Sequence, residues 1–143
     1  MESLQRLQAI EEIRLLKARY FRFMDTKQWA ALADLFMPDL QVLRPDGGVY
    51  LQGGAEFAAS LKHSLEHSVS VHQGFMGEIE ILGAENATGI WAMQDVIEWH
   101  GKHPVQGWKS IIGRGHYHET YRKHERAWRI ASLCLIRLRL DTA

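Results

Sequence analysis

The chain has 143 residues, of which 46% are hydrophobic and 24% charged, values typical of one globular domain with its own core. Its 17 basic residues balance 17 acidic ones, so the overall charge gives no reason to expect a nucleic-acid partner. One cysteine, Cys134, excludes an internal disulfide and a multi-cysteine zinc site. No apolar run has the length of a membrane span and the N-terminus shows no signal pattern, so we expect a cytoplasmic protein without a membrane partner.

The first predicted element is a helix that ends near Asp25. Its apolar side chains recur in steps of three and four, the spacing of one helix face, at Ile10, Ile13, Leu16, Tyr20, Phe23 and Met24. A helix that brings Tyr20 and Asp25 into one neighbourhood could form the wall of a pocket. Alternatively, Asp25 or Thr26 only caps a second helix predicted at residues 30–36, because short oxygen-bearing side chains accept free N–H groups there.

The middle of the chain is predicted to form a small hairpin and a third helix. Pro38 should stop the helical pattern, because proline cannot continue a helix. Residues 40–43 and 49–52 are typical of short strands around a turn at residues 45–48. Residues 55–65 then show a helical face of small side chains and leucines.

From Val69 onward the hydrophobic period changes to two, which indicates strands. The predicted strands are residues 69–76, 79–81, 88–99, 108–122 and 128–140. We expect these strands to form an antiparallel meander behind the helices, which makes residues 1–143 a single α+β domain. A sheet that curls around the first helix would enclose a cavity, and ligand sites form in such cavities.

Several motifs, in this order along the chain, resemble SnoaL-like domains of the nuclear transport factor 2-like superfamily. They are Arg19 with Tyr20, MDTKQW at residues 24–29, HQG at 72–74, TGIWAM at 88–93 with Asp95, GHYHETY at 115–121 and WRI at 128–130. The resemblance implies a cone, with N-terminal helices packed in a curled antiparallel sheet around a cavity. Within that group the pattern is nearest to the bile-acid 7α-dehydratases, the scytalone dehydratases and the hexachlorocyclohexane dehydrochlorinases.

The resemblance implies a dehydratase-type lyase or isomerase that needs no cofactor. In those enzymes an aspartate and a histidine form a general-base dyad, which Asp25 and His72 match. Tyr20 stands five residues before Asp25, as in the bile-acid dehydratases, and Asp95 matches their second aspartate.

The family's arginine near the final strand is matched by Arg129, with Arg137 as the alternative. The substrate would be a small hydrophobic molecule, which could be polycyclic, against apolar walls of Phe23, Trp91 and Met93.

Two other interpretations stay open on the sequence. His72 and Tyr20 could be ordinary core residues of a non-catalytic module of the same fold that binds a small molecule or another protein. His116 and His118 share one strand face and could bind a metal with His72, although no tight ligand spacing supports this, so we predict no metal site.

We also expect a homodimer or homotrimer packed through the sheet, because Trp99, Trp108, Leu133 and Leu135 add more apolar surface than one helix layer can cover.

Overall fold

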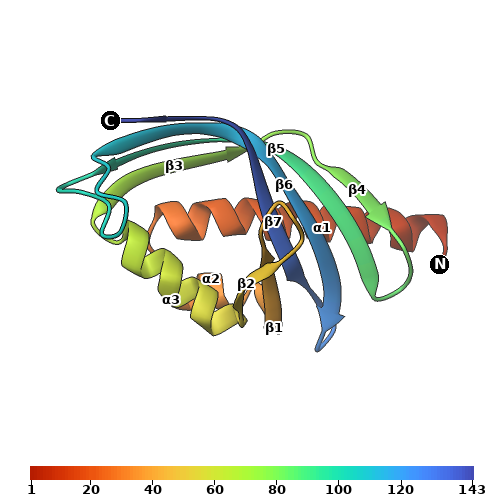
Figure 1. Ribbon diagram of the computed structural model, residues 1–143. Coiled ribbons are helices and arrows are strands. Elements are labelled where there is room, and N and C mark those ends of the chain that lie inside the picture. Colours follow the sequence, from red (N-terminus) through yellow and green to blue (C-terminus); the bar gives the residue numbers. More distant parts are fainter.

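A strongly curved sheet wraps around the long N-terminal helix, and two shorter helices lie beside the open end (Figure 1). The computed structural model describes residues 1–143. The helices are α1 (Ser3–Asp25), α2 (Trp29–Ala33) and α3 (Gly54–Leu65). The strands are β1 (Phe36–Leu43), β2 (Val49–Gln52), β3 (Ser68–Gly74), β4 (Glu78–Ile81), β5 (Asn86–Trp99), β6 (Ser110–His124) and β7 (Ala127–Thr142). This arrangement confirms the predicted α+β class.

The sheet has seven strands in the order β2-β1-β7-β6-β5-β3, and β4 also pairs with β5. The meander predicted from residue 69 onward is therefore wrong in one place, because β3 and β4 do not pair with each other but with different parts of β5. The sheet is also not wholly antiparallel as expected, because β1 runs parallel to β7. Hydrophobic alternation indicates which face of a strand is buried, but it does not indicate which strands are neighbours.

Pro38 does not separate a helix from a strand, as the sequence suggested, but lies inside β1. The pairing of β1 with β7 is irregular between Phe36 and Gln41, so the ladder is interrupted around this proline. A residue without an N–H is tolerated at such a place. The second helix consequently ends at Ala33, and Phe36 begins the strand.

The concave face of the sheet and the apolar face of α1 form the core. Along β5 every second side chain from Ala87 to Trp99 is buried, and along β6 the same holds from Ile111 to Tyr121. From α1, Ile13, Leu16 and Met24 are each at most 5% exposed. The apolar helix face and the inward-facing strand residues that the sequence predicts therefore pack against each other in the structure.

A bulge at Ala131 changes which side chains of β7 face the core. Thr120 pairs with Ser132 but its neighbour Tyr121 pairs with Ile130, so Ala131 has no partner in the register. Before the bulge the even-numbered Ile130 is buried, and after it the odd-numbered Leu133 is buried. Bulges re-aim side chains in this way.

The four residues on which we based the expected assembly surface face inward instead. Trp99 and Leu133 are buried, and Trp108 and Leu135 line the internal cavity described below. Trp99, Leu133 and Leu135 lie on strands that curve over α1, and Trp108 lies in the loop before β6, so the original reason for an oligomer was wrong. No helix of the structure combines the length and the apolar character required to cross a membrane.

Candidate active site

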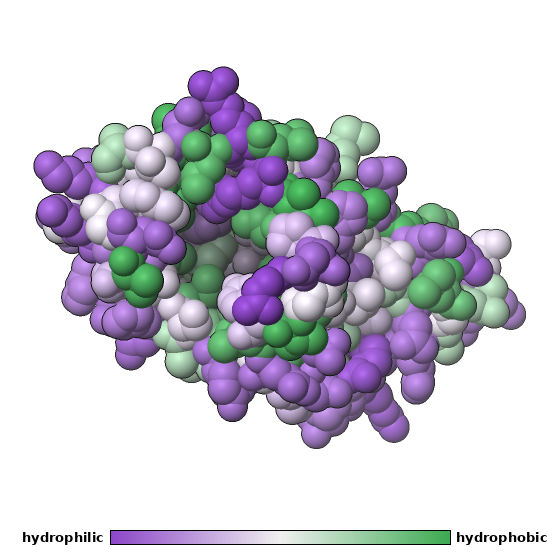
Figure 2. Space-filling model, viewed as in Figure 1, coloured by the Kyte–Doolittle hydropathy of each residue, from purple (hydrophilic) through white to green (hydrophobic).

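A cavity of about 220 Å³ lies between α1, α3 and the concave face of the sheet. Figure 2 shows a hollow on this side of the molecule. Of the 18 residues that line the cavity, 13 are hydrophobic. Its polar side chains include Tyr20, His72, Asp95, Tyr117 and Arg137, which come from five different elements. A mostly apolar cavity with a few convergent polar groups is the usual form of a small-molecule site.

Asp25 and His72 form a hydrogen-bonded pair at the end of α1. Asp25 Oδ1 lies 2.6 Å from His72 Nδ1, and Asp25 Oδ2 accepts the backbone N–H of His72 at 2.8 Å. Ser70 Oγ donates to Asp25 Oδ1 at 3.0 Å. A carboxylate on Nδ1 fixes the tautomer with the proton there, so the lone pair of the neutral ring is on Nε2.

The helix-capping alternative for Asp25 is wrong. The residue at the N-cap of α2 is Gln28, and no side chain caps that helix. The helix α1 ends at Asp25 itself, so its carboxylate points across to β3. His72 faces it because alternate residues of β3, Ser68, Ser70 and His72, are the buried ones.

Asp95 and Arg137 form a second pair in the cavity. Arg137 donates from Nη1 and Nη2 to the two oxygens of Asp95, both at 2.9 Å, and Asp95 is only 2% exposed. Burial alone would lower the pKa of Arg137, but the hydrogen bonds and charge of Asp95 raise it above the usual arginine value. His72 Nε2 lies 3.9 Å from Asp95 Oδ2. Gly113 leaves the room that this pair needs, because a Cβ there would overlap both side chains.

Two buried phenols complete the polar part of the cavity. The rings of Tyr20 and Tyr117 meet edge to face with their centroids 5.8 Å apart. Burial is the main reason why the pKa of each phenol is raised well above its usual value. Both hydroxyls therefore keep their protons at neutral pH and can donate hydrogen bonds to a substrate oxygen.

Arg129 does not reach this cavity, so the sequence prediction for the site arginine is wrong. Its half-buried side chain lines a separate depression near Glu12, Arg19 and Asp34. The reason is the bulge at Ala131, which places odd-numbered residues on the concave face only after that point. Arg137, the alternative, is the arginine in the cavity.

The three predicted apolar wall residues also lie outside the cavity lining. Phe23 is half-buried on α1, beside the inward-facing Met24. Trp91 and Met93 are buried on the concave face, but neither lines the cavity. Trp91 belongs to the first half of β5, where it packs near Lys17 and Phe21 of α1. The cavity is lined instead by the second half of β5 and by α3, with Ile97, Trp99, Phe57, Leu61 and Leu65.

A fully buried ion pair behind the phenols escaped the sequence prediction. Lys17 Nζ lies 2.7 Å from Glu119 Oε2, and neither side chain is exposed. Tyr121 donates to Glu119 Oε1 at 2.8 Å. Lys17 Nζ also lies 3.6 Å from the ring centroid of Tyr117, and burial lowers the pKa of Lys17 to about 8. The sequence contained a signal for this pair. Lys17 lies on the apolar face of α1, and Glu119 lies between Tyr117 and Tyr121 in the inward-facing alternation of β6.

His116 and His118 do not join His72, so the alternative of a three-histidine metal site is wrong. Both belong to the outward set of β6 residues, with His116 half-buried and His118 exposed, whereas His72 is on the concave side. No group of three His, Cys, Asp or Glu side chains is arranged to hold a metal ion.

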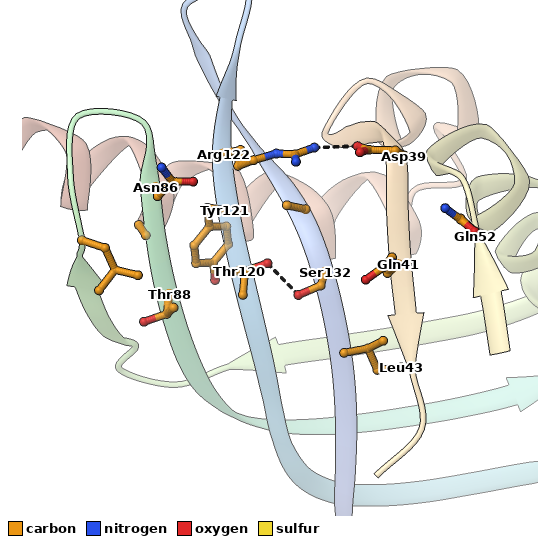
Figure 3. A pocket seen from close by; sticks show the side chains of 13 residues that line it. Asp39, Gln41, Leu43, Gln52, Asn86, Thr88, Thr120, Tyr121, Arg122 and Ser132 are labelled. Atoms are coloured by element: carbon orange, nitrogen blue, oxygen red, sulfur yellow. Dashed lines mark hydrogen bonds and ion pairs between the residues drawn. The ribbon is translucent and has the colours of Figure 1, made fainter. Parts of the chain in front are cut away.

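A second hollow of about 490 Å³ lies on the outer face of the sheet, over β5, β6, β7 and β1 (Figure 3). Most of its side chains are amides and hydroxyls, including a 2.6 Å contact between Thr120 and Ser132. Its charged groups, Arg122 and Asp39, are paired with each other at 2.6 Å. It contains no base of the kind that His72 offers, so the internal cavity is the candidate active site.

The sequence matches the family model "SnoaL-like domain" over residues 5–133. A curated relative, Probable cyclase FGR4 of Gibberella zeae, is 29% identical over 133 residues, which cover 85% of this chain and 86% of that protein. A crystal structure from Novosphingobium aromaticivorans that is named after scytalone dehydratase has a TM-score of 0.84 and 16% identity, and covers 99% of this chain and 92% of that one. A hexachlorocyclohexane dehydrochlorinase, LinA-type3 of Novosphingobium barchaimii, has a TM-score of 0.78 and 19% identity, with 99% and 94% covered.

Proposed function

Since the chain belongs to the SnoaL-like domain family and has the nuclear transport factor 2-like fold, we propose that it is a cofactor-independent lyase or isomerase. Its substrate would be a small hydrophobic molecule with an acidic C–H beside a carbonyl group. The observation that carries this proposal is the Asp25–His72 pair, with a contact of 2.6 Å, in which His72 lines a mostly apolar cavity.

In the proposed reaction, His72 acts as the base. Its Nε2 takes the proton from the substrate carbon, and Asp25 stabilises the imidazolium that forms. The C–H electron pair becomes a C=C bond, and the bond from the next carbon to its hydroxyl group breaks. The hydroxyl leaves as water with a proton from a donor in the cavity, for which Tyr20 is our assignment, and the proton that His72 has taken then replaces the one lost by Tyr20.

Arg137, Asp95 and Tyr117 have proposed roles in binding. Arg137 and Tyr117 supply donors where negative charge would develop on a carbonyl oxygen during proton removal. Asp95 holds the Arg137 guanidinium in place through two hydrogen bonds. An engineered cavity of about 150 Å³ holds benzene, so a cavity of about 220 Å³ suits a molecule of one or two rings better than a larger polycyclic one.

The test uses 3-hydroxy-1-tetralone, a bicyclic β-hydroxyketone that becomes 1-naphthol when it loses water. We expect the protein to accelerate the appearance of 1-naphthol fluorescence, and His72→Ala to abolish the acceleration. The same protein in D₂O should exchange the α-hydrogens of 1-tetralone, which isolates the proton-removal step.

The alternative is a module of the same fold that binds small molecules without catalysis. The hydrogen bonds of Asp25 and Asp95 are consistent with it, because both carboxylates are satisfied without a substrate. Tight binding of 1-tetralone, with neither exchange nor water loss on any member of a panel of ring ketones, would favour this alternative.

We also propose that the protein forms a homodimer or homotrimer through the outer face of the sheet. Val71, Val96 and Ile112 are register neighbours on β3, β5 and β6 and are each more than 40% exposed. Such an apolar patch is unfavourable in water, and a second copy of the chain would cover it. Light scattering should give a mass two or three times 16.5 kDa. Val71→Lys should return the 16.5 kDa species, whereas Val105→Lys, in an exposed loop, should not.

A further inference from the structure

A chain of hydrogen bonds leads from Asp25 Oδ1, the oxygen that also contacts His72 Nδ1, to a lysine. Lys27 Nζ lies 3.0 Å from Ser70 Oγ and 3.3 Å from Ser68 Oγ, and Ser70 Oγ lies 3.0 Å from Asp25 Oδ1. An ammonium group can only donate, so both serine oxygens accept from it. Their own protons then point onward, from Ser70 to Asp25 and from Ser68 to the Leu65 carbonyl at 2.7 Å. Each hydrogen bond in this chain therefore has a single possible donor.

The backbone of Lys27 is in an unfavourable conformation. Its φ is +62°, in the left-handed region, at the C-terminal end of α1. The Lys27 N–H donates to the Met24 carbonyl and the Gln28 N–H to the Phe23 carbonyl, a pattern that usually has glycine or asparagine at this position. A lysine here has a local cost that glycine would not have. The contacts of the Lys27 ammonium are the compensation that the structure shows.

His72 lies between two carboxylates. Asp25 contacts Nδ1 at 2.6 Å, and Asp95 lies 3.9 Å from Nε2. Two anions favour the imidazolium, and an imidazolium cannot accept a proton from a substrate. Asp95 has Arg137 as its counterion, but the only ion-pair partner of Asp25 within 4.0 Å is His72 itself. The nearby cation on the Asp25 side is therefore Lys27, reached through Ser70.

We propose that Lys27 is a positioning residue that acts on the base through Ser70 and Asp25. It orients the Asp25 carboxylate through the Ser70 hydroxyl and offsets the carboxylate charge beside the base, His72. This inference rests on the proposed role of His72 as the base. Burial lowers the pKa of Lys27, and the charge of the Asp25 carboxylate opposes that change. The other charged or titratable groups around His72 are Asp95, Arg137, Tyr20 and Tyr117.

The test is a titration of the His72 ring by NMR, which needs no substrate. The His72 signal is assigned among the eight histidines by its loss in His72→Asn. Lys27→Met removes the charge, and we expect it to move the titration midpoint of His72 upward by about half a pH unit to one pH unit. Lys27→Arg keeps the charge and should restore most of the original midpoint.

Lys27→Gly separates charge from folding, because glycine adopts the left-handed conformation without strain. It should move the midpoint as Lys27→Met does, while its melting temperature stays equal to or above that of the wild type. An unchanged midpoint in both Lys27→Met and Lys27→Gly would overturn the inference, even if the protein dehydrates the tetralone substrate. A shifted midpoint in a protein without turnover would support the charge balance and remove only the proposed function.

Discussion

Replacing Asp25 with asparagine should lower turnover by about two to four orders of magnitude, the size of general-base and base-orienting effects. The amide keeps the shape of the carboxylate, and its oxygen can still accept from the His72 backbone N–H or from Ser70. It removes the charge that stabilises the imidazolium, and with its NH₂ group toward Nδ1 it favours the wrong tautomer. Stability should change little, because the side chain is not a helix cap.

The measurement compares kcat for 3-hydroxy-1-tetralone in Asp25→Asn, His72→Ala and the double variant. Because the two residues act as one unit, the double variant should lose about as much activity as either single variant. Asp39→Asn is the matched control, since Asp39 forms an ion pair with Arg122 on the outer face. Full activity in Asp25→Asn together with His72→Ala would leave the binding module as the better account.

Lys17→Met should be the most destabilising single substitution among those considered, with a loss of about 3–5 kcal/mol in the free energy of unfolding. It leaves the Glu119 carboxylate buried without its cation, 2.7 Å from where the Lys17 ammonium had been. A typical domain is stable by only about 5–15 kcal/mol, so the variant should be partly unfolded at moderate temperature. Urea denaturation followed by tryptophan fluorescence measures the loss.

The double variant with Glu119→Gln separates unpaired charge from lost packing. Glutamine keeps an oxygen that can accept from Tyr121, so the double variant should recover a large part of the stability. Lys62→Met on the exposed side of α3 is the control and should have almost no effect. If the double variant is no more stable than Lys17→Met, the loss comes from packing and not from the Glu119 charge.

The sequence was most informative where one regular element carried the residues. Tyr20 and Asp25 share a helix whose spacing predicts one buried face, and alternation along β3 places His72 on the inner side. The motif order then pointed to the family, which the match over residues 5–133 establishes. The catalytic roles of these residues remain predictions, but their proximity is a structural fact.

The sequence was least informative where pairing between distant strands decides the position of a side chain. Arg129 has the same parity as Arg137, and only the unpaired Ala131 separates their faces. Alternation along β5 correctly predicts that Trp91 faces inward. The path of α1 over the sheet, however, covers this half of β5, so Trp91 packs against the helix and does not line the cavity. Lys17 and Glu119 were missed for another reason. Each is a single charge on an apolar face, and because they are 102 residues apart the sequence does not show that they pair with each other.

The parallel pairing of β1 with β7 has a consequence for the order of folding. Phe36 pairs with Ile130, which is 94 residues further along the chain (130 − 36), and closing so large a loop is entropically costly, so this contact should form late. Arg137 lies further along β7, after the closing contact. During synthesis the helices and the Asp25–His72 pair can form before the counterion of Asp95 exists. A nascent chain would therefore have a histidine between two carboxylates with one cation still missing, and would gain a balanced site only when the cone closes.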